Sequence, residues 1–463
     1  MRAGSTSRSS TFAEIEPVDP AAYARFLLDW HGVMAPRRGV DALFRAIEQL
    51  EGAPIPANVL EREVLPARID GYRVGDLDQL CATGEVVWRG IEPLSPGGGR
   101  IAIHLASSYP LLAPPPGKAE GAMAAKVRDV LERRGALFFS EIAREVGGFP
   151  NDVLEAIWQL VWAGEATNDT LSPLRTLATN ERTSRRDRRR PGPSRMMASR
   201  RLGLPGSEGR WSLLPALATA EAPGPTETER RTALARTLLE RHGVVTREGV
   251  QSEGIPGGFG AVYQVLRTME DAGRVRRGWF VAGLGAAQFA MPGADDRVRA
   301  QRVEADEPRT IVIAATDPAQ PWGAALKWPE TPSAARPQRA AGAHVILREG
   351  HLLAWIGRTE KSLITFLPES EPDRGHAMRA IARALAELVD RGRRKAVMIA
   401  TVDGDPTGRS VLRPALEEAG FTPSLHGHLR RARPGAPVTV RADAPVELEE
   451  AEAGDDVDDE DDD

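Results

Sequence analysis

The sequence is poor in the residues on which many catalytic and structural sites depend. Cys81 is the only cysteine among 463 residues, so the chain can form neither an internal disulfide framework nor a cysteine-based zinc site. A lone thiol is typical of a reducing compartment, and we expect a cytoplasmic location. The nearest histidine pair, His426 and His428, has no carboxylate at a helical offset. We therefore expect neither a metal nor a cofactor.

Long apolar runs and complete nucleotide-binding motifs are also missing. No apolar stretch approaches the ~20 residues that a membrane-spanning helix needs, so we expect no membrane partner. Two segments share part of the phosphate-binding loop pattern. Gly357–Ser362 has the Lys-Ser pair but lacks the first glycine at the required spacing, and Gly404–Ser410 has no lysine. This chain by itself should not hydrolyse ATP.

Charge is distributed unevenly along the chain. The formal net charge is −5, yet Asp443–Asp463 contains 13 acidic and no basic residues, so the rest of the chain carries +8. Arg182–Arg201 contains nine arginines and one acidic residue, Asp187. A basic body with an acidic tail is typical of proteins that bind nucleic acid, although acidic tails also occur as solubilising ends. We expect disorder in a leader at 1–18, a basic insertion at 180–206 and the tail at 443–463.

One helix-to-strand junction occurs three times in the chain. In each copy, two apolar residues lie three positions apart, a glycine follows four positions later, and an apolar residue comes two positions after the glycine. The copies are Leu77/Leu80/Gly84/Val86, Ile157/Leu160/Gly164/Ala166 and Leu266/Met269/Gly273/Val275. Glycine ends a helix readily because it adopts the left-handed conformation without a Cβ penalty. Although any glycine-capped amphipathic helix before a strand has this pattern, three copies predict tandem repeats of one unit.

Each repeat ends as a winged-helix domain does, with a third helix followed by a two-stranded wing. We assign these domains to 19–108, 120–216 and 226–300, and expect a proline-rich linker at Pro110–Pro116. In the first domain we expect a helix at Val59–Leu65. In the third, a capping box of Thr226 and Glu229 should begin the first helix. The 308–435 segment has short strands at turn spacing and one long helix, which predicts a β-barrel-like α+β domain. The fold class is therefore α+β, with tandem winged helices followed by a small β-barrel-like domain.

The third module has the most basic wing and is the expected nucleic-acid contact. Alternation along a strand places Arg274 and Arg276 on one face and Val275 on the other. Trp279 could stack on a base, but core packing is the favoured role, and the arginines could also form a solvated face. The predicted contacts are Gln264, Arg267, Arg274, Arg276, Arg277 and Trp279, together with Arg185, Arg186, Arg188, Arg189 and Arg190 of the basic insertion.

The second module differs from the third. Its last helix, Asn151–Ala163, has two acidic residues, no basic residue and four large apolar residues beside Trp158 and Trp162. We expect this helix to pack against a neighbouring module and not to contact DNA.

Three stretches resemble the C-terminal region of the bacterial large helicase-related (Lhr) proteins. They are Gly209–Leu213, Gly273–Ala290 and Ala315–Pro329, and the match in order and spacing extends from about residue 20 to 433. The resemblance implies tandem winged helices followed by a β-barrel, with a capacity for self-association. The family's long members are ATP-dependent DNA translocases that unwind DNA or RNA:DNA duplexes and are linked to DNA repair. Their motor domains are absent here, so the implied partners are single-stranded DNA or an RNA:DNA hybrid, a separately encoded motor and a second copy of the chain.

Glycosylase activity has also been attributed to that region, which is similar to winged-helix DNA glycosylases. Such an enzyme needs a carboxylate or amide beside a flipped base. Asp317, Asp403 and Asp405 are candidates, although roles in turns explain each of them equally well. The glutamine pair of the crosslink glycosylases is not visible, because Gln288–Ala290 has only one glutamine.

We therefore expect a nucleic-acid-binding and oligomerisation module of a helicase-type repair protein, without its own motor. A first alternative is a DNA glycosylase acting on uracil or an alkylated base. A second alternative is an interaction scaffold whose acidic tail masks the basic insertion.

Overall fold

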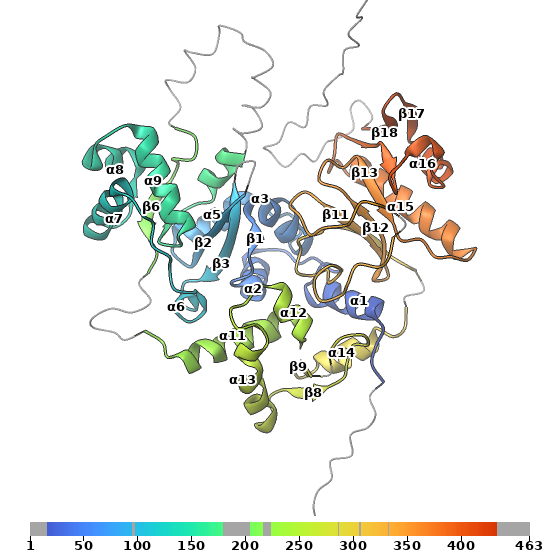
Figure 1. Ribbon diagram of the computed structural model, residues 1–463, viewed down its shortest axis with the longest axis horizontal. Helices are drawn as coiled ribbons and strands as arrows, with labels where there is room; N and C mark the ends of the chain where they lie inside the picture. Colours follow the sequence, from blue (N-terminus) through green and yellow to red (C-terminus); the bar gives the residue numbers. More distant parts are fainter. Residues whose placement is uncertain are drawn as a thin grey trace, which may run out of the picture.

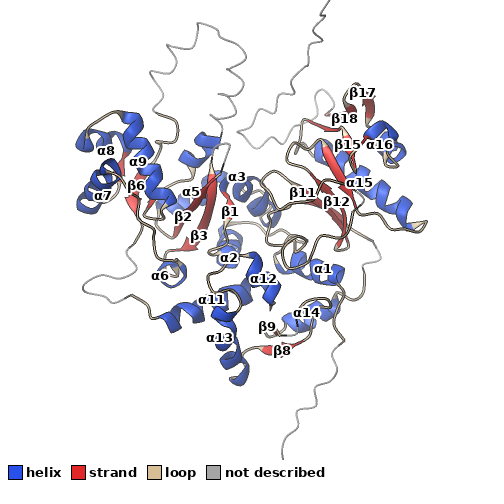
Figure 2. Cartoon of the chain, viewed as in Figure 1, coloured by secondary structure: helices blue, strands red, loops and turns tan. Residues whose placement is uncertain are grey.

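The structure is a computed structural model that describes residues 16–94, 98–178, 204–215, 224–285, 287–304, 307–331 and 333–432. The chain folds into three winged-helix units and one α+β domain, which Figure 1 shows by colour and Figure 2 by secondary structure. Elements α2, α3 and β1 of the first unit lie at the centre of the view, between the other units. None of the helices in these ranges is long and apolar enough to cross a membrane.

The first winged helix has a three-stranded sheet in the order β1-β3-β2 and a core around Trp88 and Ile103. The sequence predicted its helices and both wing strands, but the middle helical segment is longer than the expected Val59–Leu65. The elements are α2 (Val40–Leu50), β1 (Ile55–Pro56), α3 (Ala57–Val59), the π-helical η1 (Leu60–Val64), α4 (Leu65–Arg68), α5 (Val74–Ala82), β2 (Val86–Pro93), β3 (Gly99–Leu105) and α6 (Tyr109–Leu112).

The second winged helix has the sheet order β4-β6-β5, with Trp211 buried at its centre. A helix at 172–178, which the sequence analysis missed, precedes the basic insertion. Its Leu171 and Leu174 join the core that the first two modules share. The named elements are α7 (Ala122–Arg134), β4 (Leu137–Phe138), α8 (Phe139–Val146), α9 (Pro150–Trp162), β5 (Ala166–Asn168) and β6 (Arg210–Leu213).

The third winged helix repeats the arrangement, with the sheet order β7-β9-β8. Its first helix begins with the predicted capping box, in which Thr226 and Glu229 bond each other's backbone N–H. The elements are α11 (Glu227–His242), β7 (Val244–Val245), α12 (Arg247–Ser252), α13 (Gly260–Asp271), β8 (Arg276–Gly278) and β9 (Gln288–Ala290), followed by α14 (Ala294–Ala300).

The three glycine junctions have the same backbone conformation, which confirms the predicted repeat. Gly84, Gly164 and Gly273 have φ values of 78°, 71° and 69°. In each junction the residue after the glycine donates its N–H to the carbonyl of the second apolar residue, over 3.1, 2.9 and 2.8 Å. This bond terminates the helix and turns the chain into the wing.

The C-terminal domain is built on a six-stranded mixed sheet in the order β10-β11-β12-β13-β15-β16. The described pairings leave this sheet open, with β10 and β16 at its edges, and do not close it into the expected barrel. The strands are β10 (Thr310–Ala314), β11 (His344–Arg348), β12 (His351–Ile356), β13 (Ser362–Thr365), β15 (Thr401–Val402) and β16 (Asp405–Pro406).

One face of that sheet packs against α15 (Asp373–Asp390), whose alanines and Leu385 contact Ile346 and Leu363. A smaller sheet in the order β14-β18-β17 and two short helices complete the domain. These elements are β14 (Ala396–Ile399), the 3-10 turn η3 (Thr407–Arg409), α16 (Arg413–Glu418), β17 (Thr422–Ser424) and β18 (Gly427–Arg431).

The first helix of the chain, α1 (Pro20–Trp30), packs against units that are distant in sequence. Its Tyr23 and Phe26 share a core with Val281 of the third wing and with Leu326 of the C-terminal domain. Gly350 approaches this helix so closely that a Cβ there would lie 2.0 Å from the Ala21 carbonyl oxygen. The sequence placed this helix in the first module because only its own periodicity was visible.

The proline-rich segment between the first two modules is bound at both sides. Arg89 of β2 donates to the carbonyls of Pro114 and Pro115, and Arg230 of α11 donates to those of Pro110 and Ala113. The segment expected to be a linker is therefore held between the first and third modules.

Candidate nucleic-acid interface

Helix α13 occupies the position that enters or borders the major groove in a winged helix. Val262 and Leu266 are buried in the module's core, which fixes the orientation of the helix. Gln264 and Thr268 are exposed on the opposite face. Arg267 is half-buried and lies 3.8 Å from Glu270. The helix therefore offers one amide and few free cations.

The wing supplies more positive charge than the helix. Arg274 is exposed, and no ion pair is recorded for it among the described residues. Arg277 pairs with Glu270 at 3.2 Å, and Arg276 pairs with the buried Asp295 at 2.6 Å. The hydrogen bond to Asp295 raises the pKa of Arg276. Since two of the three wing arginines have carboxylate partners, Arg274 is the freest cation of the wing.

Trp279 lies on the surface beside these arginines, with 53% of the residue exposed. The favoured prediction that it packs in the core is wrong. Phe280 and Val281, the next two residues, fill that core instead, with 2% and 0% exposure. The sequence contained three adjacent apolar residues, and strand alternation alone could not decide which one faces solvent.

Gln288 fixes the shape of the wing. The residue is fully buried, and its side-chain oxygen accepts the N–H groups of Phe280 and Val281, both over 2.9 Å. Its side-chain nitrogen donates to the carbonyls of Val281 and Gly285. Because both ends of this amide are committed to the wing, the geometry gives Gln288 a structural role.

The equivalent helix of the second module is covered by the first module. Val161 of α9 lies so close to β2 that a Cβ on Gly90 would be 2.4 Å from its carbonyl oxygen. Thr167 of β5 donates to the Trp88 carbonyl over 2.7 Å. The prediction that this helix packs against a neighbouring module is confirmed.

The equivalent helix of the first module, α5, is covered in part: Asp78 is half-buried, whereas Val74 and Gln79 are exposed. Arg175, in the 172–178 helix, forms ion pairs with Asp78 of α5 at 2.7 Å and with Glu61 at 2.8 Å. Burial raises the pKa of Glu61, whereas its hydrogen bond to Arg175 lowers the pKa; the net shift is upward. The sequence gave no signal for this contact, because Arg175 and Glu61 are 114 positions apart.

The candidate carboxylates have different surroundings. Asp317 is fully buried in a bidentate pair with Arg68, at 2.7 and 2.9 Å. Asp403 accepts the backbone N–H and the hydroxyl of Thr365, both over 2.7 Å. Asp405 is exposed at the start of β16. The structure does not bring the three carboxylates together with Gln288 in one described site.

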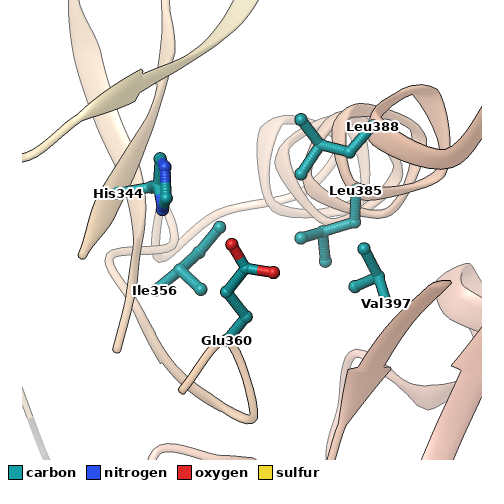
Figure 3. Close-up of a pocket in the computed structure, with 6 residues that line it drawn as sticks. All are labelled: His344, Ile356, Glu360, Leu385, Leu388 and Val397. Atoms are coloured by element: carbon teal, nitrogen blue, oxygen red, sulfur yellow. The ribbon is translucent and has the colours of Figure 1, made fainter. Parts of the chain in front are cut away.

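Two cavities in the described part of the chain differ in size. One lies between the C-terminal sheet and α15, has a volume of about 10 Å³ and is shown in Figure 3. That volume corresponds to about one water molecule, so it cannot hold a base. The other has about 160 Å³ and lies in the first module beside Leu43 and Tyr72. In the part of the chain that the structure describes, no three His, Cys, Asp or Glu side chains come together as a metal site.

Several predicted elements lie outside the described residues. These are Arg185, Arg186, Arg188, Arg189 and Arg190 of the basic insertion, the acidic tail Asp443–Asp463, and most of the leader. Their roles stay predictions.

Comparison with known families identifies two of the three modules directly. Residues 18–106 and 224–310 match two winged-helix domain models of the large helicase-related proteins, the third and the fourth domain respectively. Through these domains, the chain belongs to the Lhr family. The modules that the repeat spacing defined as first and third are thus the third and fourth winged helices of an Lhr protein.

Two longer Lhr proteins are similar over most of this chain. "Lhr helicase/ probable uracil glycosylase" of Mycolicibacterium smegmatis is 40% identical over 438 residues, which is 90% of this chain. "Lhr helicase/uracil glycosylase" of Escherichia coli is 34% identical over 448 residues, or 89% of the chain. The chain spans 28% of the length of each relative and corresponds to its C-terminal part.

A solved structure, the DNA glycosylase AlkZ of Streptomyces sahachiroi, covers 81% of this chain with a TM-score of 0.42 and 13% sequence identity. The match covers 96% of that glycosylase.

Two features of this chain's third module, which matches the fourth Lhr winged helix, were not expected from the sequence. Arg247 is exposed at the start of α12, a helix that crosses the DNA backbone in helix-turn-helix proteins. Val18 extends the wing, since its N–H donates to the Phe280 carbonyl and its carbonyl accepts the Ala282 N–H, both over 2.8 Å. Arg247 could have been found as a cation at the first position of the second helix, whereas the pairing of Val18 left no local signal.

Proposed function

We propose that this chain is the nucleic-acid-binding part of an Lhr-type repair helicase, and that its third module makes the contact through α13 and the wing. A helicase motor and further copies of this chain are the partners that the proposal implies. Single-stranded DNA or an RNA:DNA hybrid is the expected ligand.

The observation that carries this proposal is the difference between the three equivalent helices. Helix α5 contacts the 172–178 helix and α9 packs against β2, and neither helix contains a basic residue. Helix α13 contains Arg267 and keeps Gln264 and Thr268 exposed beside a basic wing. Arginine contacts to phosphates position a protein on nucleic acid without reading its sequence. The scarcity of free donors on α13 therefore favours binding with little sequence preference.

We expect the Arg274→Ala/Arg277→Ala variant to bind a labelled DNA strand more weakly and with a shallower salt dependence. Each lost phosphate contact should reduce the slope of log K against log salt by about 0.7–0.9. Fluorescence anisotropy at several salt concentrations measures both quantities. Arg276 is left unchanged because its removal would leave the buried Asp295 without its 2.6 Å partner.

Two further variants make that experiment specific. Arg45→Ala/Arg144→Ala removes the same charge from exposed positions outside the third module and should change little. Trp279→Ala should weaken binding by about 1–3 kcal/mol if a base stacks on the indole, with no change in the salt slope. If the wing variant matches the Arg45/Arg144 control in affinity and slope, the wing is not the contact.

A DNA glycosylase is the second candidate function, because both relatives carry that activity in their names. Asp405 is the candidate carboxylate that is exposed and free to approach a flipped base. Under this candidate, the pure chain converts uracil-containing single strands into alkali-labile products, and Asp405→Asn abolishes the conversion. The Asp403→Asn variant controls for changes in the same loop. No product from the unaltered chain would rule the activity out.

A further inference from the structure

Two loops of the C-terminal domain bring exposed basic residues together at one end of the sheet. The turn between β12 and β13 carries Arg358 and Lys361, and the loop between α15 and β14 carries Arg393 and Lys395. All four are exposed, and we call them the basic ridge. The turn belongs to the segment that failed as a nucleotide-binding loop, and the loop reads Arg-Gly-Arg-Arg-Lys over residues 391–395.

A partly buried ion pair holds the two loops against each other. Arg394 contacts Glu360 at 2.7 Å, and its backbone N–H donates to the Leu388 carbonyl over 2.8 Å. On the other loop, the Lys361 carbonyl accepts the Ala400 N–H over 2.8 Å. Both loops are therefore fixed by contacts that do not involve the four ridge side chains. The charges are consequently preorganised and do not depend on a ligand for their arrangement.

The carboxylates near the ridge already have other side-chain partners. Glu360 pairs with Arg394, and Glu63 of the first module contacts His344 at 2.6 Å. Glu387 pairs with Arg391 at 2.7 Å. Among the described residues, no ion pair is recorded for any ridge side chain. Within the described residues, the ridge thus has an excess of positive charge that no ion pair neutralises.

Electrostatic effects on neighbouring groups agree with this excess. Desolvation, followed by repulsion from Arg391, lowers the pKa of Arg393, and Arg394 adds to the effect. Burial would raise the pKa of Glu63, but His344, Arg394 and Arg393 together bring it below its ordinary value. Cations held this close repel one another, and binding an anion relieves the repulsion.

The shape below the ridge indicates an extended ligand. Figure 3 shows the Glu360 carboxylate lying between His344 and the side of α15 that carries Leu385 and Leu388. The cavity there has a volume of about 10 Å³, room for about one water molecule. That cavity has no room for a small phosphorylated molecule, whereas a chain of phosphates can lie across the surface and contact the four cations.

We propose that the basic ridge is a second nucleic-acid contact, which binds the phosphodiester backbone independently of the third module's wing. Figure 1 shows α13 and β8 at the bottom of the view and β13 at the upper right, so the two surfaces are separate. One strand that reached both would gain affinity from the second contact, because that contact forms at high effective concentration.

The test compares two fourfold alanine variants of the full chain. The ridge variant replaces Arg358, Lys361, Arg393 and Lys395 and leaves Arg394 and Glu360 intact. The control replaces four exposed cations elsewhere, Arg45, Lys126, Arg144 and Lys327, and so has the same net charge. Thermal unfolding checks that both variants fold, and anisotropy with a long labelled DNA strand gives the affinity and the salt slope.

We expect the ridge variant to bind at least tenfold more weakly than the control, with a salt slope that is shallower by about 2–3. Combining the ridge variant with Arg274→Ala/Arg277→Ala should weaken DNA binding further. If only the wing variant has an effect, the ridge proposal is overturned and the proposed function stands. If only the ridge variant has an effect, the wing of the third module is not the nucleic-acid contact that the proposed function assigns, and the ridge proposal stands. Equal binding by the ridge variant and its control overturns the ridge proposal.

Discussion

The Asp317→Asn variant should lower the free energy of unfolding by about 3–5 kcal/mol, because it leaves the buried Arg68 without a counter-ion. The two side chains are 3% and 0% exposed and make two hydrogen bonds, at 2.7 and 2.9 Å. Arg68 belongs to the first module and Asp317 to the C-terminal domain, so the pair joins units 249 positions apart. Urea unfolding followed by tryptophan fluorescence would measure the change.

An exposed ion pair provides the comparison. Arg38 and Asp70 lie 2.5 Å apart, with 80% and 52% of their side chains exposed. The Asp70→Asn variant should cost less than about 1 kcal/mol, since water and salt screen an exposed pair. The double variant Arg68→Met/Asp317→Leu should recover much of the lost stability, because it removes both buried charges together. Equal urea midpoints for Asp317→Asn and Asp70→Asn would show that the buried pair does not stabilise the folded chain.

Stability should fall as the pH is lowered from about 6.5, because the chain buries neutral histidines. Burial, with repulsion from Arg89, lowers the pKa of His104 to about 3. Burial and the charge of Arg68 lower the pKa of His31 well below its ordinary value. In this pH range the unfolded chain binds protons that the folded chain does not, so acid favours unfolding. Between pH 6.5 and 4.5, His104 alone should account for about 2 kcal/mol.

The His104→Phe variant isolates this effect. The ring of His104 packs edge-on against Tyr109 at 5.4 Å, and neither of its nitrogens has a hydrogen-bond partner. Phenylalanine should therefore fit the site and flatten the loss of stability between pH 6.5 and 4.5. The His426→Phe variant removes an exposed imidazole as a control. A pH dependence that is the same in both variants would contradict the assignment to His104.

Local structure followed closely from the sequence. The apolar spacing, the capping box at Thr226 and the three glycine junctions each depend on residues a few positions apart, and the structure confirms all of them. The expected β-barrel is the least supported element, because the described strand pairings form an open sheet. Strand positions could be read from short apolar runs, whereas sheet closure depends on partners that are distant in sequence.

The predicted interface stays a prediction, and the sequence could not rank its side chains by exposure or by ion pairing. Strand alternation correctly placed Arg274 and Arg276 opposite Val275. It could not show that Asp295, on the following helix, holds Arg276 at 2.6 Å, or that Trp279 is on the surface. Contacts between the modules likewise decided how α5 and α9 pack.

By itself, the sequence determined the repeat, the helices and wings, the basic third wing and the absence of a nucleotide-binding loop. Each of these depends on composition or on spacing within one element, where local geometry is strongly constrained. Only the tertiary structure decided that the 172–178 helix contacts α5 and that β2 packs against α9. It alone decided that Val18 pairs with the third wing, and that the turn with Arg358 and Lys361 lies beside the loop with Arg393 and Lys395. Those outcomes depend on packing between segments far apart in the chain, which no local pattern specifies.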